Sequence, residues 1–308
     1  MFRHLLVPLD GSPEAEAVLP LTATLALGLQ AQVTLLHVLD PAGPAAGREI
    51  HRLQDPEDAQ AYLAGLARSP LFMGAAVRVH VHGGPDPGVA ASIRWHAEEW
   101  GADLILLAPR RKPWRPPLGG GGVTRQVLRR GRTSLLLVRP GPSTDEPRAS
   151  CRTILMALDL SHGSDPAIPL ARDLARALSA RLCFVQPVPN LGTLAACPVA
   201  LYLPLSMRAV LDREAEEAAA ALREVEAGCR ARGIWTRSYV RRGSLSGVLA
   251  ELTQSLRTDL LVMRTRPSGP REAFSVGSVT PQLLRTPGPP LLLLRADPEA
   301  PYSPRAHC

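Results

Sequence analysis

The chain of 308 residues carries one sequence pattern twice, and this duplication limits its fold more than any other feature. The run Leu5–Asp10, LLVPLD, returns as Ile154–Asp159, ILMALD, with a shift of 149 residues (159 − 10). Further along, Gly121 matches Gly277 with a shift of 156 (277 − 121). The chain is therefore predicted to contain two copies of one domain, and the second copy is longer by about seven residues in its middle.

The duplication divides the chain into segments of domain size. We place the first domain at residues 1–140 and the second at residues 151–296, each long enough, at ~150 residues, to bury its own core. Residues 141–150 are rich in proline, glycine and polar side chains without an apolar period, which predicts a linker. Residues 297–308 are expected to form a disordered tail.

Each copy alternates short apolar runs with segments of helical spacing, the pattern of a parallel α/β sheet covered on both faces. In the first copy, strands are predicted at 5–9, 33–39, 77–82, 104–108 and 135–138, and helices at 13–29, 56–68, 87–100 and 123–130. In the second copy, strands are predicted at 153–158, 182–186, 236–240, 260–264 and 291–294, and helices at 165–178, 206–232, 245–255 and after 277. The expected fold class is α/β, with two tandem, doubly wound, parallel five-stranded sheets of Rossmann-like type.

Composition argues against several classes of protein. No uninterrupted apolar stretch approaches the ~18 residues of a membrane span, and the chain enters a strand pattern without a signal peptide. We therefore expect a cytoplasmic protein with no membrane partner. The net charge of +7 comes from scattered arginines without a nucleic-acid motif, so no nucleic-acid partner is expected. Five cysteines without a close CxxC pair argue against a disulfide framework and a zinc ribbon.

Several short motifs, in the order of the predicted elements, resemble the universal stress protein family. They are LVPLDGS at Leu6–Ser12, VLP at Val18–Pro20, TLLHV at Thr34–Val38 and GADLI at Gly101–Ile105. The resemblance covers nearly the whole chain and occurs in both copies. It implies the adenine nucleotide alpha hydrolase-like fold in each copy, with any ligand at the carboxyl ends of the strands.

The resemblance also implies an adenine-nucleotide site, with ATP or AMP as the ligand. Members that bind nucleotide hold adenosine with an aspartate at the end of the first strand and a residue on the second. They hold phosphates with a loop patterned G-x-x-G-(nine residues)-G-[ST], whose glycines let backbone N–H groups approach phosphate at a helix start. The candidate residues here are Asp10, Val38, Gly119, Gly120, Gly121, Gly122 and Val123 in the first copy, and Asp159, Gly277, Ser278 and Val279 in the second.

Both copies depart from the family's loop at its first two glycines. The first copy has Ala108 and Arg111 at these positions, and the second copy has Arg264 and Pro267. An arginine side chain fills space that phosphate needs, and a proline removes an N–H donor. In the first copy, Gly119–Gly122 could form a replacement anion-binding nest beside the arginines of the loop, or a flexible loop with its arginines in water.

Other polar residues allow two interpretations each. Asp10 and Asp159 end apolar strands, so each could bind a ligand or cap the following turn by accepting backbone N–H bonds. His80 and His82 point to the same face of a strand, a spacing that metals sometimes use. No third ligand is evident nearby in the sequence, and His37 on another strand is a speculative partner, so we expect a solvated or hydrogen-bonded pair.

The last apolar run of each copy is predicted to be an edge strand. These runs are Leu135–Val138 and Leu291–Leu294, and a bare apolar edge invites aggregation. We predict that the two strands pair about a pseudo-two-fold axis and form an internal pseudo-dimer, as subunits of single-domain members of the family do. The alternative is that the linker or the tail covers each edge.

Together these features predict a non-enzymatic, universal stress-type protein with a stress-response or regulatory role and weakened or altered nucleotide binding. The alternative is an ATP- or AMP-binding sensor whose partner binding depends on nucleotide occupancy. Besides an adenine nucleotide, we expect unidentified protein partners and assembly of the pseudo-dimer alone or into a higher homo-oligomer. Ser161–Asp165, SHGSD, is similar to the SGGxDS loop of ATP pyrophosphatases but has one glycine in place of two, so an enzyme is disfavoured.

Overall fold

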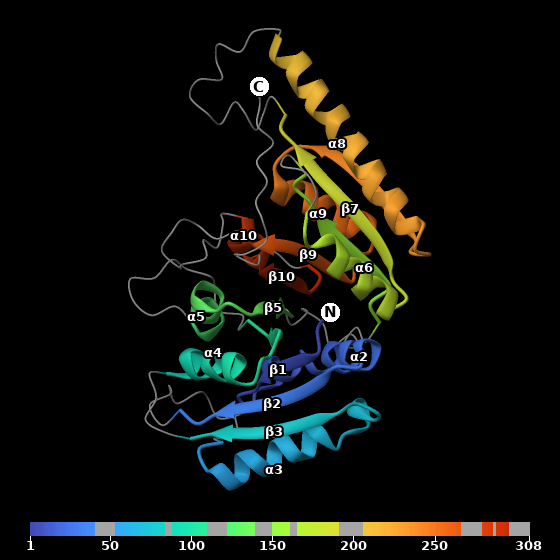
Figure 1. Ribbon diagram of the computed structural model, residues 1–308. Helices are drawn as coiled ribbons and strands as arrows, with labels where there is room; N and C mark the ends of the chain where they lie inside the picture. The colour runs from blue at the N-terminus through green and yellow to red at the C-terminus, as the bar shows by residue number, and fades with distance from the viewer. Residues whose placement is uncertain are drawn as a thin grey trace. The chain divides into compact units, whose positions relative to one another are not determined.

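The computed structural model in Figure 1 describes residues 1–40, 53–83, 88–109, 122–138, 150–160, 165–190, 206–265, 279–285 and 288–295. Most of the predicted linker at 141–150 and all of the predicted tail at 297–308 lie outside these residues. The chain divides into two compact units. The first includes Met1–Cys151 and Pro290–Arg295, and the second includes Arg152–Arg264 and Ser278–Pro289.

The first unit is built on parallel strands in the order β3-β2-β1-β4-β5. These strands are β1 (His4–Pro8), β2 (Gln32–Val38), β3 (Val77–His82), β4 (Leu104–Leu107) and β5 (Ser134–Leu137). The central strands β1 and β4 are rich in buried leucine, as expected of strands covered on both faces. The winding reverses between β1 and β4, and doubly wound sheets bind ligands outside the carboxyl ends at this position.

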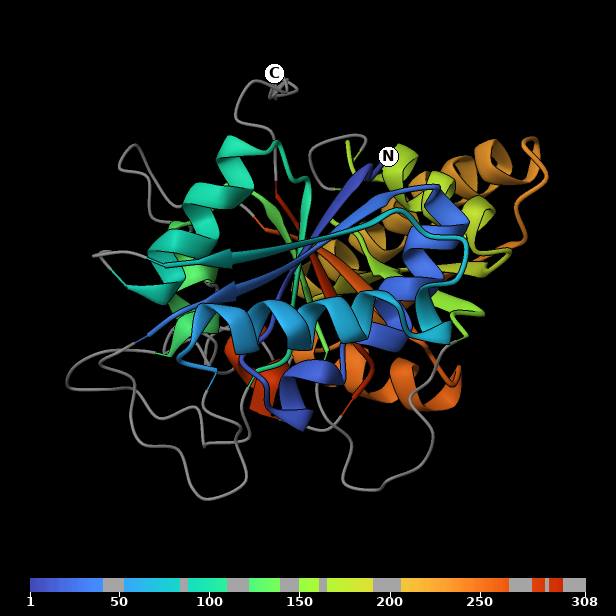
Figure 2. The ribbon, with the colours of Figure 1, turned by 90° about the horizontal axis from the view of Figure 1, so that it is seen from below.

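Helices cover both faces of this sheet, as Figure 2 shows for α3 against β2 and β3. They are α1 (Pro13–Glu16), α2 (Leu19–Leu29), α3 (Pro56–Ala67), α4 (Val89–Glu99) and α5 (Val123–Arg130), with a short 3-10 helix η1 (Pro70–Phe72). Helices α2 and α3 lie on one face, and α4 and α5 lie together on the other. Right-handed crossovers require this arrangement, because the strand order reverses.

One predicted helix of the first copy is divided in two. The pattern at 13–29 predicts a single helix, but the structure has α1 and α2 with Ala17 and Val18 between them. Pro20 is the physical reason, because it has no N–H to donate to the carbonyl of Glu16 and its ring would clash with that group. Proline instead stands in the first turn of α2, where no such bond is needed.

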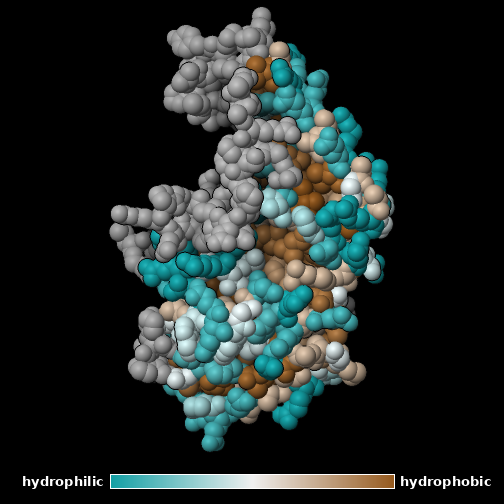
Figure 3. All heavy atoms as spheres, viewed as in Figure 1, coloured by the Kyte–Doolittle hydropathy of each residue, from teal (hydrophilic) through white to brown (hydrophobic). Residues whose placement is uncertain are grey.

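The second unit repeats this plan with parallel strands in the order β9-β6-β7-β8. Its strands are β6 (Thr153–Ala157), β7 (Arg181–Val188), β8 (Thr236–Arg242) and β9 (Leu260–Thr265), and its described helices are α6 (Ile168–Ala177), α8 (Ser206–Arg230), α9 (Leu245–Ser255) and α10 (Val279–Arg285). Helix α8 is amphipathic: Leu211, Ala218 and Leu222 are buried, while hydrophilic residues cover its outer side (Figure 3). Within the described residues, no helix combines the length and apolarity needed to cross a membrane.

An aspartate before the fourth strand of each unit holds the start of the first strand. Both carboxylates accept two backbone N–H bonds. The bonds are from Arg3 and His4 to Asp103, at 2.7 and 3.2 Å, and from Arg152 and Thr153 to Asp259, at 2.9 and 3.0 Å. The two copies therefore share side-chain contacts as well as strand order.

The final strand, β10 (Leu291–Arg295), belongs to the first unit and pairs antiparallel with β5. Leu291 lies opposite Leu137, and Leu293 lies opposite Leu135. The predicted pairing of the two last apolar runs is therefore confirmed. Arg295 fixes the end of β10, because its guanidinium donates to the carbonyl oxygens of Leu128 and Thr133. Burial lowers the pKa of Arg295 to about 10.

Candidate functional site

The candidate residues of the first copy that the structure describes lie at the carboxyl edge of its sheet. Asp10 follows β1, Val38 is the last residue of β2, and Gly122 directly precedes Val123, the first residue of α5. Because parallel strands end at the same edge, the fold brings these residues to the side where a ligand is expected. The other loop positions, Gly119, Gly120, Gly121 and Arg111, lie outside the described residues.

Asp10 and Ser12 organise the turn after β1. One oxygen of the half-buried Asp10 carboxylate accepts hydrogen bonds from the Ser12 backbone N–H at 3.1 Å and the Ser12 hydroxyl at 2.5 Å. The Ser12 hydroxyl oxygen accepts a bond from the Ala15 N–H at 3.2 Å and caps α1. Gly11 has a φ of 78°, a left-handed conformation that glycine adopts without strain. Asp10 thus has the capping role that was one of its two predicted roles.

Tyr62, which the sequence did not single out, lies near this turn. Its hydroxyl donates to the carboxylate of Glu16 at 2.8 Å. Burial raises the pKa of Tyr62 above its ordinary value, and the bond to Glu16 and the negative charges of Glu16 and Asp10 raise it further. The phenol is therefore a neutral donor at physiological pH. No sequence signal indicates this contact, because it depends on how α3 packs beside α1.

The start of α5 is suited to an anion. Gly122 is the N-cap, no side chain caps the first turn, and that turn contains Arg125 and no acidic residue. The positive end of the helix dipole therefore faces the edge without a neutralising carboxylate in that turn. A methyl group added at Gly122 would have no atom within 4 Å, so packing does not require glycine there.

The matching edge of the second unit carries an ion pair. Arg264, at the position of the family's first glycine, places its Nε 3.4 Å from Oδ1 of Asp165. The Asp165 side chain is 2% exposed and also accepts a bond from the Ala167 N–H at 2.9 Å. Asp159 is exposed after β6, and Pro187 lies near the end of β7. Gly277, Ser278 and Pro267 lie outside the described residues, and Val279 begins α10.

The expectation for His80 and His82 needs a correction. A third histidine does lie beside them: Nε2 of His96, on α4, is 2.9 Å from Nδ1 of His82. His37, the speculative partner, instead lies with its ring nitrogens 2.8 Å from the Leu9 carbonyl oxygen and 2.9 Å from that of Leu53. Burial lowers the pKa of both His80 and His96. The sequence did offer one signal for this proximity, because a right-handed crossover after β3 brings α4 over the face of that strand.

The comparisons with known proteins agree with the fold. The model of the universal stress protein family matches residues 1–139 and 150–295. A universal stress protein from Archaeoglobus fulgidus DSM 4304 superimposes with a TM-score of 0.68 at 16% identity, over 96% of this chain and 97% of that one. A functionally unknown protein from Pseudomonas aeruginosa PAO1 gives a TM-score of 0.65 at 18% identity, over 96% and 92%.

The same fold also occurs within a larger protein. The cytoplasmic domain of a prokaryotic cation chloride cotransporter gives a TM-score of 0.55 at 14% identity, with 95% of each chain covered. No curated protein sequence gives a significant match. At these identities the structural likenesses establish the fold alone, whereas the family model matches two tandem segments that make up most of the chain. The chain therefore belongs to the universal stress protein family.

Proposed function

We propose that this chain is a non-enzymatic, cytoplasmic stress-response regulator whose two copies have diverged in nucleotide binding. The first copy keeps weakened binding of an adenine nucleotide at the carboxyl edge of its sheet. The second copy has lost the phosphate site that the family pattern implies. The observation that carries the proposal is the ion pair between Arg264 and Asp165 at the second edge.

The ion pair opposes phosphate binding in two ways. The side chain of Arg264 occupies a position where a glycine would let backbone N–H groups approach phosphate oxygens. Its charge is also balanced by Asp165, which brings a carboxylate to the edge where an anionic ligand would have to bind. In the first copy the matching position is Ala108, whose side chain is a single methyl group. The first edge therefore keeps more room for phosphate at this position.

The contacts of Asp10 support a binding role without catalysis. Its carboxylate accepts two hydrogen bonds from Ser12 within its own turn. These bonds fix the orientation of the carboxylate, which suits a group that positions a ligand. The start of α5 offers phosphate a helix N-terminus at the same edge.

Isothermal titration of the full chain with Mg-ATP and with AMP tests this proposal. We expect one site per chain with a Kd weaker than about 10 µM, equivalent to less than about 7 kcal/mol of binding. Asp10→Ala should remove the binding, whereas the matched variant Asp159→Ala should leave it unchanged. Loss of binding in Asp159→Ala alone, two equal sites, or no binding at millimolar nucleotide would contradict the proposal.

Two further outcomes separate the rival functions. Micromolar binding, with a Kd tighter than about 10 µM, that disappears in Asp10→Ala would favour an ATP or AMP sensor over a protein with weakened binding. Release of phosphate or pyrophosphate above a heat-inactivated control, with Mg²⁺, Mn²⁺ or Zn²⁺ present, would contradict the non-enzymatic assignment. The titration and the release assay need the same purified chain and can be run in parallel.

A further inference from the structure

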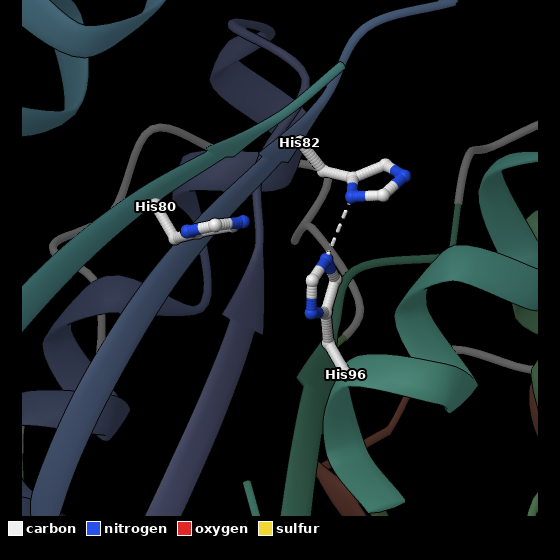
Figure 4. A group of neighbouring side chains, drawn as sticks. All are labelled: His80, His82 and His96. Carbon is white, nitrogen blue, oxygen red and sulfur yellow. Dashed lines mark hydrogen bonds between the residues drawn. The ribbon is translucent and has the colours of Figure 1, made fainter. Parts of the chain in front are cut away.

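Three histidines converge between a strand and a helix of the first unit (Figure 4). His80 and His82 come from β3, and His96 comes from α4. One nitrogen from each ring can be chosen so that all three lie within 4.8 Å of one another. Neutral imidazole is the commonest side-chain ligand for metal ions in proteins, and three imidazoles with one open position form a known type of zinc site.

His96 is held in an orientation that suits a metal ligand. Its side chain is 3% exposed, and its Nδ1 lies 3.2 Å from Oε2 of Glu99. A carboxylate accepts hydrogen bonds, so Nδ1 carries a proton and the lone pair of neutral His96 lies on Nε2. That nitrogen faces His82. Metal-bound histidines commonly donate their other N–H to a carboxylate in this way.

Aromatic rings hold the cluster from the side of α4. Trp100 stacks on His96 with ring centroids 4.1 Å apart and contacts His80 edge-on at 4.9 Å. Trp95 lies 6.0 Å from His82. These contacts restrict the imidazole rings before any ligand binds, which lowers the entropy cost of forming a site.

The second copy shows that the fold does not need these histidines. Leu36 pairs with His80, and Val185, 149 residues later (185 − 36), pairs with Tyr239, so Tyr239 is the counterpart of His80. By the same register Arg241 is the counterpart of His82. His96 is the eighth residue of α4, and the eighth residue of α9 is Leu252, which is as buried as His96 at 2% exposure.

A buried leucine thus fills the place of His96 in the same framework. A leucine needs no polar partner when it is buried, whereas buried His96 uses both ring nitrogens, one with Glu99 and one with His82. Packing alone therefore does not account for three histidines at positions where the other copy has tyrosine, arginine and leucine. A bound ligand for their nitrogens does account for them.

We propose that His80, His82 and His96 bind one Zn²⁺ ion, with water in the remaining position. The ligands are Nε2 of His96, Nδ1 of His82 and one ring nitrogen of His80. Zn–N bonds of about 2.0–2.1 Å would draw the three nitrogens, now within 4.8 Å of one another, closer together. The proton that His82 now shares with His96 moves to Nε2 of His82, so the imidazole remains neutral. Cu²⁺ would bind the same nitrogens more tightly when present.

Zinc titration of the full chain, after treatment with a chelator and desalting, tests the site. In competition with a chromophoric chelator, we expect one equivalent of Zn²⁺ per chain. His80→Gln/His82→Gln should weaken this binding at least about 100-fold, and Glu99→Gln should weaken it about 10- to 100-fold while keeping all three ligands. His162→Gln, which removes a histidine of the second copy, is the matched control and should bind as the unaltered chain does.

Co²⁺ spectra identify the ligand type, since the chain also contains cysteines. Histidine ligation predicts visible d–d bands without a thiolate charge-transfer band. Circular dichroism checks that His80→Gln/His82→Gln remains folded, as expected because both side chains are only partly buried. The proposal is overturned if the chain binds no zinc in competition, if the folded double variant binds equally well, or if the Co²⁺ spectrum shows thiolate ligation.

Discussion

The two copies use the same framework for different contacts at two places. On the face of β3, the first copy has histidines that meet His96, whereas β8 carries Tyr239 with Arg237 and Arg241 stacked against its ring at 5.5 and 5.3 Å. At the carboxyl edge, Glu16 of the first copy bonds to Tyr62, whereas its counterpart Asp165 (165 − 16 = 149) pairs with Arg264. The comparison teaches that the framework accommodates either set of side chains. The fold does not fix these residues, so they can differ with the site that each copy carries.

The largest expected effect comes from giving the first copy the residues of the second. The variant His80→Tyr/His82→Arg/His96→Leu keeps side chains that this fold already accommodates, but it removes all three imidazoles. With free Zn²⁺ at 100 times its Kd, the unaltered chain should gain about 2.7 kcal/mol of stability, and the triple variant should gain none. Thermal unfolding with and without zinc measures this. A zinc-induced gain that persists in the triple variant would show that the copies do not differ in this way.

A feature that both copies share should give nearly equal effects. Asp103→Ala and Asp259→Ala each leave two backbone N–H groups without their carboxylate acceptor, so each should cost about 1–3 kcal/mol. The asparagine variants should cost less, because an amide oxygen still accepts. Urea unfolding of the four variants measures the costs. A large cost in one copy with none in the other would refute the equivalence of the two positions.

The ion pair at the second edge should contribute a smaller amount. Arg264→Gln leaves the buried Asp165 carboxylate without its cation and should destabilise the protein by about 1–2 kcal/mol. This is below the cost of breaking a fully buried pair, because Arg264 is 22% exposed. Arg264→Lys retains the charge and is the matched control. If urea unfolding shows that Arg264→Gln is as stable as the unaltered chain, the ion pair no longer supports the loss of the phosphate site in the second copy.

The smallest effect concerns the thiols of the second copy. Burial raises the pKa of Cys183 and of Cys229 above the ordinary value. A raised pKa means less thiolate at a given pH, so alkylation at about pH 8 should be at least about tenfold slower than in urea and should accelerate as the pH rises. Mass spectrometry of iodoacetamide-treated protein, peptide by peptide, gives the rates. Alkylation of native Cys183 as fast as in urea would place it at the surface.

The sequence predicts the framework well because the framework repeats. Each described strand lies at an apolar run that the sequence predicts to be a strand. The pairing of β5 with β10 follows from the need to cover an apolar edge. The break between α1 and α2 is missed although Pro20 is visible, because proline is also common in a first helical turn. The predicted domain boundaries remain predictions.

The sites are less predictable because they depend on contacts between elements. The arginine at position 264 is evident in the sequence, but its partner Asp165 is not, because 99 residues (264 − 165) separate them. His96 is missed for the same reason: a periodic pattern says that α4 has a buried face, but not which strand residues lie under it. Asp10 is predicted with two roles, and hydrogen bonding to Ser12 supplies the structural one.

The antiparallel contact between β5 and β10 has a consequence for biosynthesis. Leu137 leaves the ribosome 154 residues (291 − 137) before its partner Leu291, a delay of roughly 8–30 s at typical translation rates of about 5–20 residues per second. Throughout that interval β5 lacks its partner strand β10. The leucine-rich edge of β5 therefore remains available for pairing with other nascent chains.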